Sequence, residues 1–221
     1  MEKPVRAVIL FGPPGAGKGT QARELGQRMQ VPHISTGEMF RAQIRAGTDL
    51  GRHAQGIMGR GALLPDEWVN DLVRGRLEDP DCRRGFVLDG YPRTPVQAAT
   101  LERLLGGSNG TRIVVCNLVV GYNEIIRRTA GRRVCPRCGT SYNIHLRPPR
   151  QDCVCDLDGT PLKTRPDDRE ESVRERLQEY DKQSRPVLDY FREHGWPVHD
   201  VDAVAAPARV LEQLLQVVEG A

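Results

Sequence analysis

The chain of 221 residues has few lysines, few aromatic side chains and no long hydrophobic run. Only four of its 32 basic residues are lysines, so 28 are arginines. Its longest apolar stretches, residues 7–11 and 113–120, are far shorter than the roughly 20 residues of a membrane-spanning helix. Aromatic residues make up 5% of the chain and the net charge is +3, which is unlike a nucleic-acid-binding protein. We therefore expect neither a membrane nor a nucleic acid as partner.

The N-terminus also lacks the pattern of a secretory signal, because residues 1–4 lead directly into an apolar, strand-like run. We therefore expect a reducing, cytoplasmic location, where clustered cysteines indicate metal ligands before disulfides. Four of the six cysteines lie within 21 residues, from Cys135 to Cys155. The other two, Cys82 and Cys116, lie far from this cluster in the sequence, and we expect them to be inert structural thiols.

Strand-like and helix-like segments alternate and predict an α/β fold with a mainly parallel sheet. The expected strands are residues 5–11, 86–89, 112–120 and 198–201. The expected helices are residues 21–29, 35–46, 49–58, 66–78, 95–105, 123–130, 168–191 and 206–218. Gly106 and Gly107 end the fifth helix, and Pro186 predicts a kink or break near the end of the seventh. Residues 131–166 are rich in Cys, Arg, Pro and Gly and predict a small inserted subdomain.

A glycine-rich loop at residues 12–18, Gly-Pro-Pro-Gly-Ala-Gly-Lys, joins the first expected strand to the first expected helix. This is the context of a phosphate-binding loop. Glycines let backbone N–H groups face phosphate oxygens, the helix N-terminus adds its positive dipole end, and Lys18 can reach the β and γ phosphates. The Ser or Thr that usually follows the lysine is Gly19 here, with Thr20 next. We therefore expect Mg²⁺ to be held through water, phosphate and a carboxylate elsewhere.

Several further motifs carry a resemblance to a known family. They are Gly-Lys-Gly-Thr at 17–20, Ile-Ser-Thr-Gly-Glu-Met-Phe-Arg at 34–41, Phe-Val-Leu-Asp-Gly-Tyr-Pro-Arg-Thr at 86–94 with Gln97, Gly-Arg-Arg-Val at 131–134, Arg-Pro-Asp-Asp at 165–168 and Arg-Glu-Arg at 174–176. Together they resemble the nucleoside monophosphate kinases, and among these the long-form adenylate kinases with a zinc-binding lid. The resemblance spans essentially the whole chain.

The resemblance implies a parallel-sheet P-loop core with helices on both faces, a small helical NMP-binding insertion and a zinc-containing lid. Residues 1–34, 65–130 and 169–221 would form the core, residues 35–64 the NMP-binding region and residues 131–168 the lid. It also implies the reaction ATP + AMP ⇌ 2 ADP, with Mg²⁺, by a monomer. Such a transfer asks the protein mainly for positioning, charge compensation and exclusion of water.

The resemblance also implies roles for individual residues. ATP would bind to Gly15, Ala16, Gly17, Lys18, Gly19, Thr20, Arg128, Arg132, Ser141, Tyr142 and Ala205. AMP would bind to Thr36, Arg41, Ala62, Leu63, Leu64, Gly90, Tyr91, Pro92, Arg93, Gln97, Arg165 and Arg176. The catalytic residues would be Lys18, Arg93, Arg132, Arg165 and Arg176.

The residue types fit these roles. The amide of Gln97 offers one donor side and one acceptor side to an adenine edge. Asp89 ends an expected strand close to the phosphate loop and is the expected carboxylate for the water shell of Mg²⁺, with Asp167 and Asp168 as second choices. No pairing of the five histidines suggests acid–base catalysis, and the phosphate of AMP is already anionic, so none is required.

The cysteine cluster predicts a structural zinc site, which needs four N, S or O ligands. Cys135 and Cys138 stand at i and i+3 before a glycine, and Cys155 and Asp158 repeat that spacing. The resemblance favours these four residues as ligands. Cys153 in place of Asp158, and a lid without metal, remain alternatives.

Two other functions compete with an adenylate kinase. One is a kinase for UMP, CMP or GMP, because base choice depends on few contacts. The other is a zinc-knuckle nucleic-acid-binding module fused to an NTPase, which the weak net charge disfavours. The charge is also local: residues 127–176 hold 12 basic and 8 acidic residues, whereas the remainder holds 20 and 21. The positive excess therefore lies where the resemblance places groups that meet nucleotide phosphates.

Overall fold

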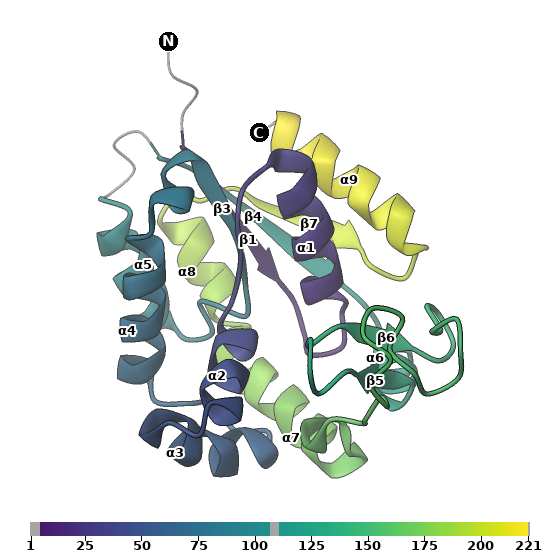
Figure 1. The fold of residues 1–221 in the computed structure, drawn as a ribbon. Helices are drawn as coiled ribbons and strands as arrows, with labels where there is room; N and C mark the ends of the chain where they lie inside the picture. The colour runs from purple at the N-terminus through teal and green to yellow at the C-terminus, as the bar shows by residue number, and fades with distance from the viewer. Residues whose placement is uncertain (1–4, 107–110, 221) are drawn as a thin grey trace.

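The computed structural model describes residues 5–106 and 111–220. Its main sheet has five parallel strands in the order β2-β3-β1-β4-β7 (Figure 1). The strands are β1 (Val5–Phe11), β2 (His33–Ser35), β3 (Gly85–Asp89), β4 (Thr111–Val119) and β7 (Val198–Asp202). The α/β prediction is confirmed, and all four expected strands are present within a residue of their predicted ends. The three-residue β2 was missed because it is too short to show a periodic pattern.

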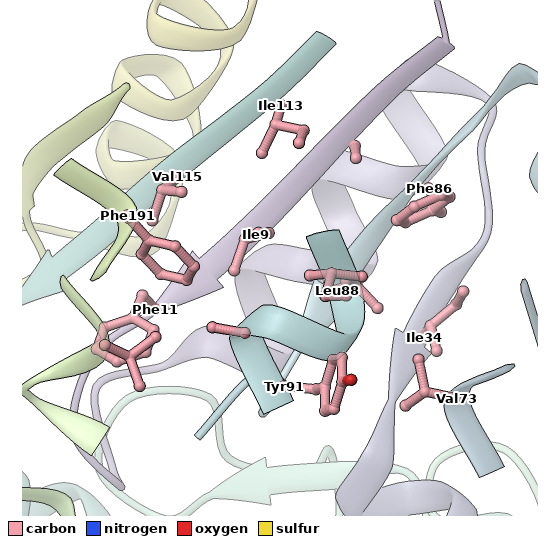
Figure 2. Close-up of a cluster of buried hydrophobic side chains, with 14 of the residues drawn as sticks. Ile9, Phe11, Ile34, Val73, Phe86, Leu88, Tyr91, Ile113, Val115 and Phe191 are labelled. Carbon is pink, nitrogen blue, oxygen red and sulfur yellow. The ribbon is translucent and has the colours of Figure 1, made fainter. Parts of the chain in front are cut away.

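Helices cover both faces of the sheet, because the central strands β1, β3 and β4 present apolar side chains in both directions (Figure 1). Along β1, Ile9 and Phe11 point into one buried cluster and Val8 and Leu10 into the other. The helices α4 (Asp66–Leu77), α5 (Pro95–Leu104) and α8 (Val187–Glu193) supply the first cluster, part of which Figure 2 shows. The helices α1 (Lys18–Met29) and α9 (Pro207–Gly220) supply the second.

Two helices, α2 (Thr36–Arg45) and α3 (Asp49–Gly59), lie beyond the end of the sheet where β2 and β3 stop (Figure 1). Ser35 is the N-cap of α2, since its hydroxyl oxygen accepts a hydrogen bond from the backbone N–H of Glu38. A short 3₁₀ turn, η1 (Pro80–Arg84), leads into β3. These connections bring the ends of β2 and β3 and the start of α2 to one place.

The segment after α6 (Tyr122–Ala130) forms a separate small subdomain, as its composition predicts. Its strands β5 (Arg132–Val134) and β6 (Ser141–Asn143) pair antiparallel. Its buried cluster contains only Cys135, Tyr142 and Cys155. So small a core cannot supply much hydrophobic stabilisation, which leaves the subdomain in need of another restraint.

The helix expected over residues 168–191 is present in two pieces, and the break predicted near Pro186 is confirmed. A 3₁₀ turn, η2 (Pro166–Asp168), precedes α7 (Glu170–Glu179), and a π-turn, η3 (Tyr180–Ser184), separates α7 from α8. In the π-turn the backbone N–H of Arg185 donates to the carbonyl of Tyr180, five residues earlier. Pro186 has no N–H to continue an α-helix, so the break begins one turn before the proline.

Two further expectations concern the N-terminal segment and the absence of a membrane-spanning helix. Residues 1–4, on which the argument about a secretory signal depends, lie outside the described residues, as does Gly107. Across the described part of the chain, no helix combines the length and apolar character that crossing a bilayer requires.

Candidate active site

The phosphate loop connects β1 to α1 at the carboxyl end of the sheet, as the sequence predicts. Gly15 and Gly17 both have positive φ angles, 82° and 97°, which favour glycine. A Cβ on Gly15 would lie 2.9 Å from side-chain atoms of Ile125 and Thr129, so this turn packs closely against α6. Gly17 caps α1 without a side chain, which leaves the first N–H groups of the helix free to meet an anion.

Lys18 folds back over this loop. Its Nζ donates to the carbonyl oxygens of Gly12 at 2.7 Å and Pro13 at 2.8 Å. Burial and, to a smaller extent, the charges of nearby arginines lower the pKa of Lys18 to about 7, while Asp89 opposes the change. A lysine in this setting gains from a bound anion, which would stabilise its charged form.

Asp89 ends β3 beside the phosphate loop, as expected. Its Oδ2 lies 3.6 Å from Nε2 of His33, and a Cβ on Gly19 would lie 3.2 Å from the same oxygen. Burial alone would raise the pKa of Asp89, but His33, Lys18 and Arg93 outweigh it and lower the pKa to about 2. The carboxylate is therefore ionised at neutral pH. Glycine at position 19 keeps side-chain atoms away from it.

Five arginines that the sequence places far apart come together, and they are Arg41, Arg93, Arg132, Arg165 and Arg176. The charges of Arg93, Arg132 and Arg176 act on Lys18, and that of Arg41 acts on Arg93 and Arg165. Burial, followed by their charges on one another, lowers the pKa of Arg93 to about 10 and that of Arg165 to about 9. The pKa values of Arg41 and Arg176 are also lowered, again first by burial. Six cations at one place, against the few carboxylates described next, make a site for a multiply charged anion.

Asp167 and Asp168 face these arginines. Asp167 lies 3.1 Å from Arg176, whereas Asp168 lies 3.4 Å from Arg132 and 3.8 Å from Arg176. The Asp168 side chain is fully buried, and neither of its oxygens has a hydrogen-bond partner within the described part of the chain. Together with Asp89, these two aspartates supply most of the negative charge that opposes the lowering of the arginine pKa values. The centre thus keeps a positive surplus, and these two aspartates are already engaged with arginine.

A pocket beside this cluster collects most of the side chains expected to bind AMP. Its lining includes Thr36, Ala62, Leu63, Leu64, Gly90, Arg93 and Gln97. The hydroxyl of Thr36 donates to the carbonyl of Gly90 at 2.8 Å, which joins α2 to the end of β3. A second pocket, next to the phosphate loop, contains Lys18, Arg176, Tyr91 and Pro92 and shares Leu63, Gly90 and Arg93 with the first. The two cavities are therefore contiguous across Arg93.

The opposite side of the loop carries Arg128. Its guanidinium donates to the carbonyl oxygens of Ala16 at 3.2 Å and Ala203 at 2.7 Å, and it pairs with Glu124 at 2.7 Å. These contacts tie the phosphate loop to the end of β7, where the expected ATP-binding residue Ala205 also lies. Arg41 and Arg165 lie with the cation cluster rather than in the lining of either pocket.

Tyr142 and Ser141 lie on β6 in the small subdomain, which we call the lid (residues 131–168). The hydroxyl of Tyr142 lies 3.5 Å from Sγ of Cys155 and accepts a hydrogen bond from the backbone N–H of Asp156 at 2.9 Å. The hydroxyl of Tyr142 therefore makes its contacts inside the lid, next to the cysteine cluster. These contacts do not support the role in ATP binding that was expected for Tyr142.

The four residues predicted as metal ligands, Cys135, Cys138, Cys155 and Asp158, do come together. Their ligand atoms all lie within 4.8 Å of one another. Sγ of Cys138 is 3.6 Å from Sγ of Cys155, close to the separation of about 3.8 Å that tetrahedral zinc imposes on sulfur ligands. Hydrogen bonding from Thr160 lowers the pKa of Asp158, which favours the ligating form. Among the described residues, this cluster does not include Cys153, which is exposed.

Comparison with known proteins decides the family. A family model described as "Adenylate kinase" matches residues 10–196, which is most of the chain. The chain belongs to the adenylate kinase family. This membership confirms the resemblance read from its motifs and places the chain among the nucleoside monophosphate kinases, which are phosphotransferases.

Curated members of the adenylate kinase family match nearly end to end. The chain is similar to an adenylate kinase of Methanococcoides burtonii, with 43% identity over 96% of this chain and 98% of the relative. An adenylate kinase of Methanocella arvoryzae is 47% identical over 88% and 89% of the two chains. One of Desulfitobacterium hafniense is 44% identical over 96% and 97%.

Sequence reasoning missed several residues of the site that this adenylate kinase fold assembles. Phe40, Met58 and Val69 line the pocket that also contains Gln97, and the apolar faces of their helices were the only available signal. His33 and Asp66 make contacts between different elements, with Asp89 and Gln97 respectively. Such pairs cannot be read from spacing along one segment, because the partners meet only after the chain has folded.

Proposed function

We propose that the chain is an adenylate kinase that catalyses ATP + AMP ⇌ 2 ADP with Mg²⁺. The observation that carries the proposal is the meeting of Lys18 and five arginines between a phosphate loop and an adjoining pocket. A multiply charged anion is the ligand that such a cluster lacks, and two nucleotides whose phosphates meet would supply it. The similarity of the chain to adenylate kinases of other organisms supports this assignment.

On the ATP side, residues 15–20 would cradle the phosphates through backbone N–H groups and the N-terminus of α1. Lys18 would exchange the carbonyls of Gly12 and Pro13 for phosphate oxygens. Arg128 would lie against the adenine, and the segments around Ser141 and Ala205 would complete the site for base and ribose. Each of these groups orients the donor, which is most of what phosphoryl transfer requires.

On the AMP side, Gln97 would recognise the base, and Thr36, the backbone of residues 62–64 and residues 90–93 would surround the nucleotide. Arg41 and Arg93 would hold its phosphate through bidentate hydrogen bonds. Arg132, Arg165 and Arg176 would neutralise charge on the group in transfer. The phosphate oxygen that attacks is already anionic, so the protein needs to remove no proton.

The residues around Asp89 fit a Mg²⁺ ion held through water. The carboxylate is ionised, it lies beside the phosphate loop, and Gly19 leaves space next to it. A Mg²⁺ bound there with ATP supplies charge compensation to the phosphate oxygens. Asp167 and Asp168 fit this role less well, because both already face arginines.

The lid would close over the reacting groups about hinges near residues 131 and 168. Closure would bring Arg132 and Arg165, which border the lid at its two ends, onto the phosphates and exclude water. Zinc held by the Cys135 cluster would keep the lid rigid during this motion. In this arrangement residues 1–34, 65–130 and 169–221 act as the core and residues 35–64 as the NMP-binding region, in a cytoplasmic monomer.

A coupled assay that offers AMP, GMP, CMP and UMP with ATP and Mg²⁺ tests the proposal. We expect AMP to give by far the highest kcat/KM, and equal rates with the four nucleotides would contradict it. Lys18→Met should lower activity at least about a thousandfold while the circular dichroism spectrum stays unchanged. A change of the exposed Lys182 to Met is the matched control and should leave activity intact.

A further inference from the structure

The side-chain amide of Gln97 is fixed by two short hydrogen bonds. Its Oε1 accepts from the backbone N–H of Arg93 at 2.8 Å, and its Nε2 donates to Oδ1 of Asp66 at 2.7 Å. Gln97 is only 1% exposed, so water cannot readily replace either partner. These contacts leave the amide one N–H and one oxygen lone pair for a ligand in the pocket it lines.

Each of the two partners of the amide can take only one role in a hydrogen bond, either donor or acceptor. A backbone N–H can only donate, and a carboxylate can only accept. A rotation of the amide by 180° would place its NH₂ group against the N–H of Arg93 and its oxygen against Asp66. Both hydrogen bonds would then become repulsive contacts in a buried site. The orientation of Gln97 is therefore set by its surroundings and not by the ligand.

Asp66 is itself held firmly. The hydroxyl of Thr94 lies 3.0 and 3.1 Å from its two carboxylate oxygens and donates to them. Asp66 is also the first residue of α4, where the helix dipole favours a negative charge. Thr94 also connects Asp66 back to Gln97. As the N-cap of α5, its hydroxyl oxygen accepts a hydrogen bond from the backbone N–H of Gln97 at 3.1 Å. None of the groups in this hydrogen-bond network can exchange its role as donor or acceptor without the loss of a hydrogen bond.

A fixed amide distinguishes between purines. Adenine carries a donor at its exocyclic N6 and an acceptor at N1, whereas guanine carries an acceptor at O6 and a donor at N1. One orientation of a glutamine amide matches the first pattern, and only the rotated amide matches the second.

We propose that Asp66 determines the base specificity of the acceptor site by locking Gln97 in the orientation that reads adenine. Asp66 acts here as a positioning residue, because it works through Gln97 and does not touch the nucleotide. The inference rests on the proposed function, in which Gln97 recognises the base of AMP. It predicts that selectivity against GMP depends on a residue outside the nucleotide contacts.

The test is Asp66→Asn, assayed with AMP and with GMP. Asparagine can turn either its oxygen or its NH₂ group toward Gln97, so the lock from this side is lost and only Arg93 opposes rotation. The ratio of kcat/KM for AMP to that for GMP should fall by about tenfold, the order expected for one hydrogen bond to a charged group. The matched control is Glu67→Gln, which removes a charge from the same turn of α4 at an exposed position, and its ratio should equal that of the wild type.

The outcomes separate the inference from the proposed function. A wild type without preference for AMP would defeat the proposed function itself. A wild type that prefers AMP, with an Asp66→Asn variant that loses activity or thermal stability but keeps the AMP:GMP ratio, would defeat the inference and leave the function standing. That result would make Asp66 a purely structural residue.

A second measurement needs no variant. In the wild type, the side-chain NH₂ of Gln97 should exchange with solvent at least about a hundredfold more slowly by NMR than that of the exposed Gln55, since a donor in a stable buried hydrogen bond exchanges only on opening. Equal exchange rates would show that the amide is not locked and would overturn the inference even if Asp66→Asn failed to fold.

Discussion

Among the described residues, the apolar clusters on the two faces of the sheet hold 20 and 15 buried residues, whereas the apolar cluster of the lid holds three. Two of those three are cysteines whose sulfur atoms belong to the candidate metal cluster. Stability in the core is thus spread over many contacts that each contribute little, whereas in the lid, with the proposed zinc bound, it would be concentrated on four ligand atoms. A single substitution in the core should therefore lower its stability only in part, whereas loss of one ligand in the lid should unfold the whole lid.

The largest effect should follow from truncation of Phe191, which is fully buried and packs against Phe11 and Trp196 with ring centroids 5.9 and 5.2 Å away. Phe191→Ala should lower the free energy of unfolding by about 3–5 kcal/mol, measured by urea titration, because it removes apolar contact and leaves a cavity. Val96→Ala, at a position 60% exposed, should change it by less than about 0.5 kcal/mol. Comparable losses would contradict the division into buried layers.

The second effect should be confined to the lid. Cys135→Ser, or removal of metal with a chelator, should abolish zinc binding and the hydrogen-exchange protection of lid amides while core amides stay protected. Activity should survive at low temperature and fall at temperatures that the wild type tolerates, since a loosened lid misplaces Arg132 and Arg165. Cys153→Ser is the control. If it lost zinc as Cys135→Ser does, Cys153 and not Asp158 would be the fourth ligand.

The third prediction compares the cations that the two regions supply. The core supplies Lys18, whose pKa is lowered to about 7, and bound phosphates should raise that pKa. At pH 8 the free amine is mostly neutral and the bound amine is charged, so ATP binding should take up nearly one proton, and affinity should fall as pH rises above 7. Calorimetry in buffers of different ionisation enthalpy measures this uptake.

Lys18→Met should abolish the uptake of a proton, because no titrating amine remains. Arg165→Gln, a change at the end of the lid, should weaken ATP binding and keep the uptake, since Arg165, with a pKa of about 9, is already mostly charged at pH 8. Loss of the proton uptake in both variants would mean that the lid and not Lys18 carries the titrating group.

The smallest effect should follow Tyr142→Phe, which removes one hydroxyl beside Cys155 and the hydrogen bond to the backbone of Asp156. We expect a loss of about 1 kcal/mol in the local stability of the lid, measured by exchange of the Asp156 amide. Tyr122→Phe, at a residue 52% exposed, is the control and should change nothing there. A drop in ATP affinity without any change in lid exchange would instead support the nucleotide role expected for Tyr142.

The parts of the molecule that the sequence predicts well are those whose signal is local. The apolar runs of β1, β3 and β4 and the capping residue Ser35 lie within single segments, and so does the loop that ends at Lys18. The spacing of Cys155 and Asp158 likewise indicated the correct members of the cluster that the structure brings together.

The parts that escaped prediction depend on contacts between segments. The pairs His33–Asp89 and Gln97–Asp66 join residues from separate elements, and the π-turn before Pro186 replaces what sequence pattern alone presents as a continuous helix. Tyr142 was assigned by its motif, while its neighbours in space, Cys155 and Asp156, decide where its hydroxyl goes. Local pattern sets the elements, and packing decides which polar groups meet.

The strand order β2-β3-β1-β4-β7 has a consequence for how variants can be sorted. Thr36 and Gly90 follow the strands on one side of β1, the phosphate loop follows β1 itself, and Ala203 follows β7 on the other side. Because parallel strands lie about 4.8 Å apart, the proposed sites of the acceptor base, the phosphates and the donor base would follow one another along roughly 19 Å of the sheet edge. The position of a substitution along this edge of the sheet should therefore predict whether it changes the Michaelis constant for AMP or that for ATP.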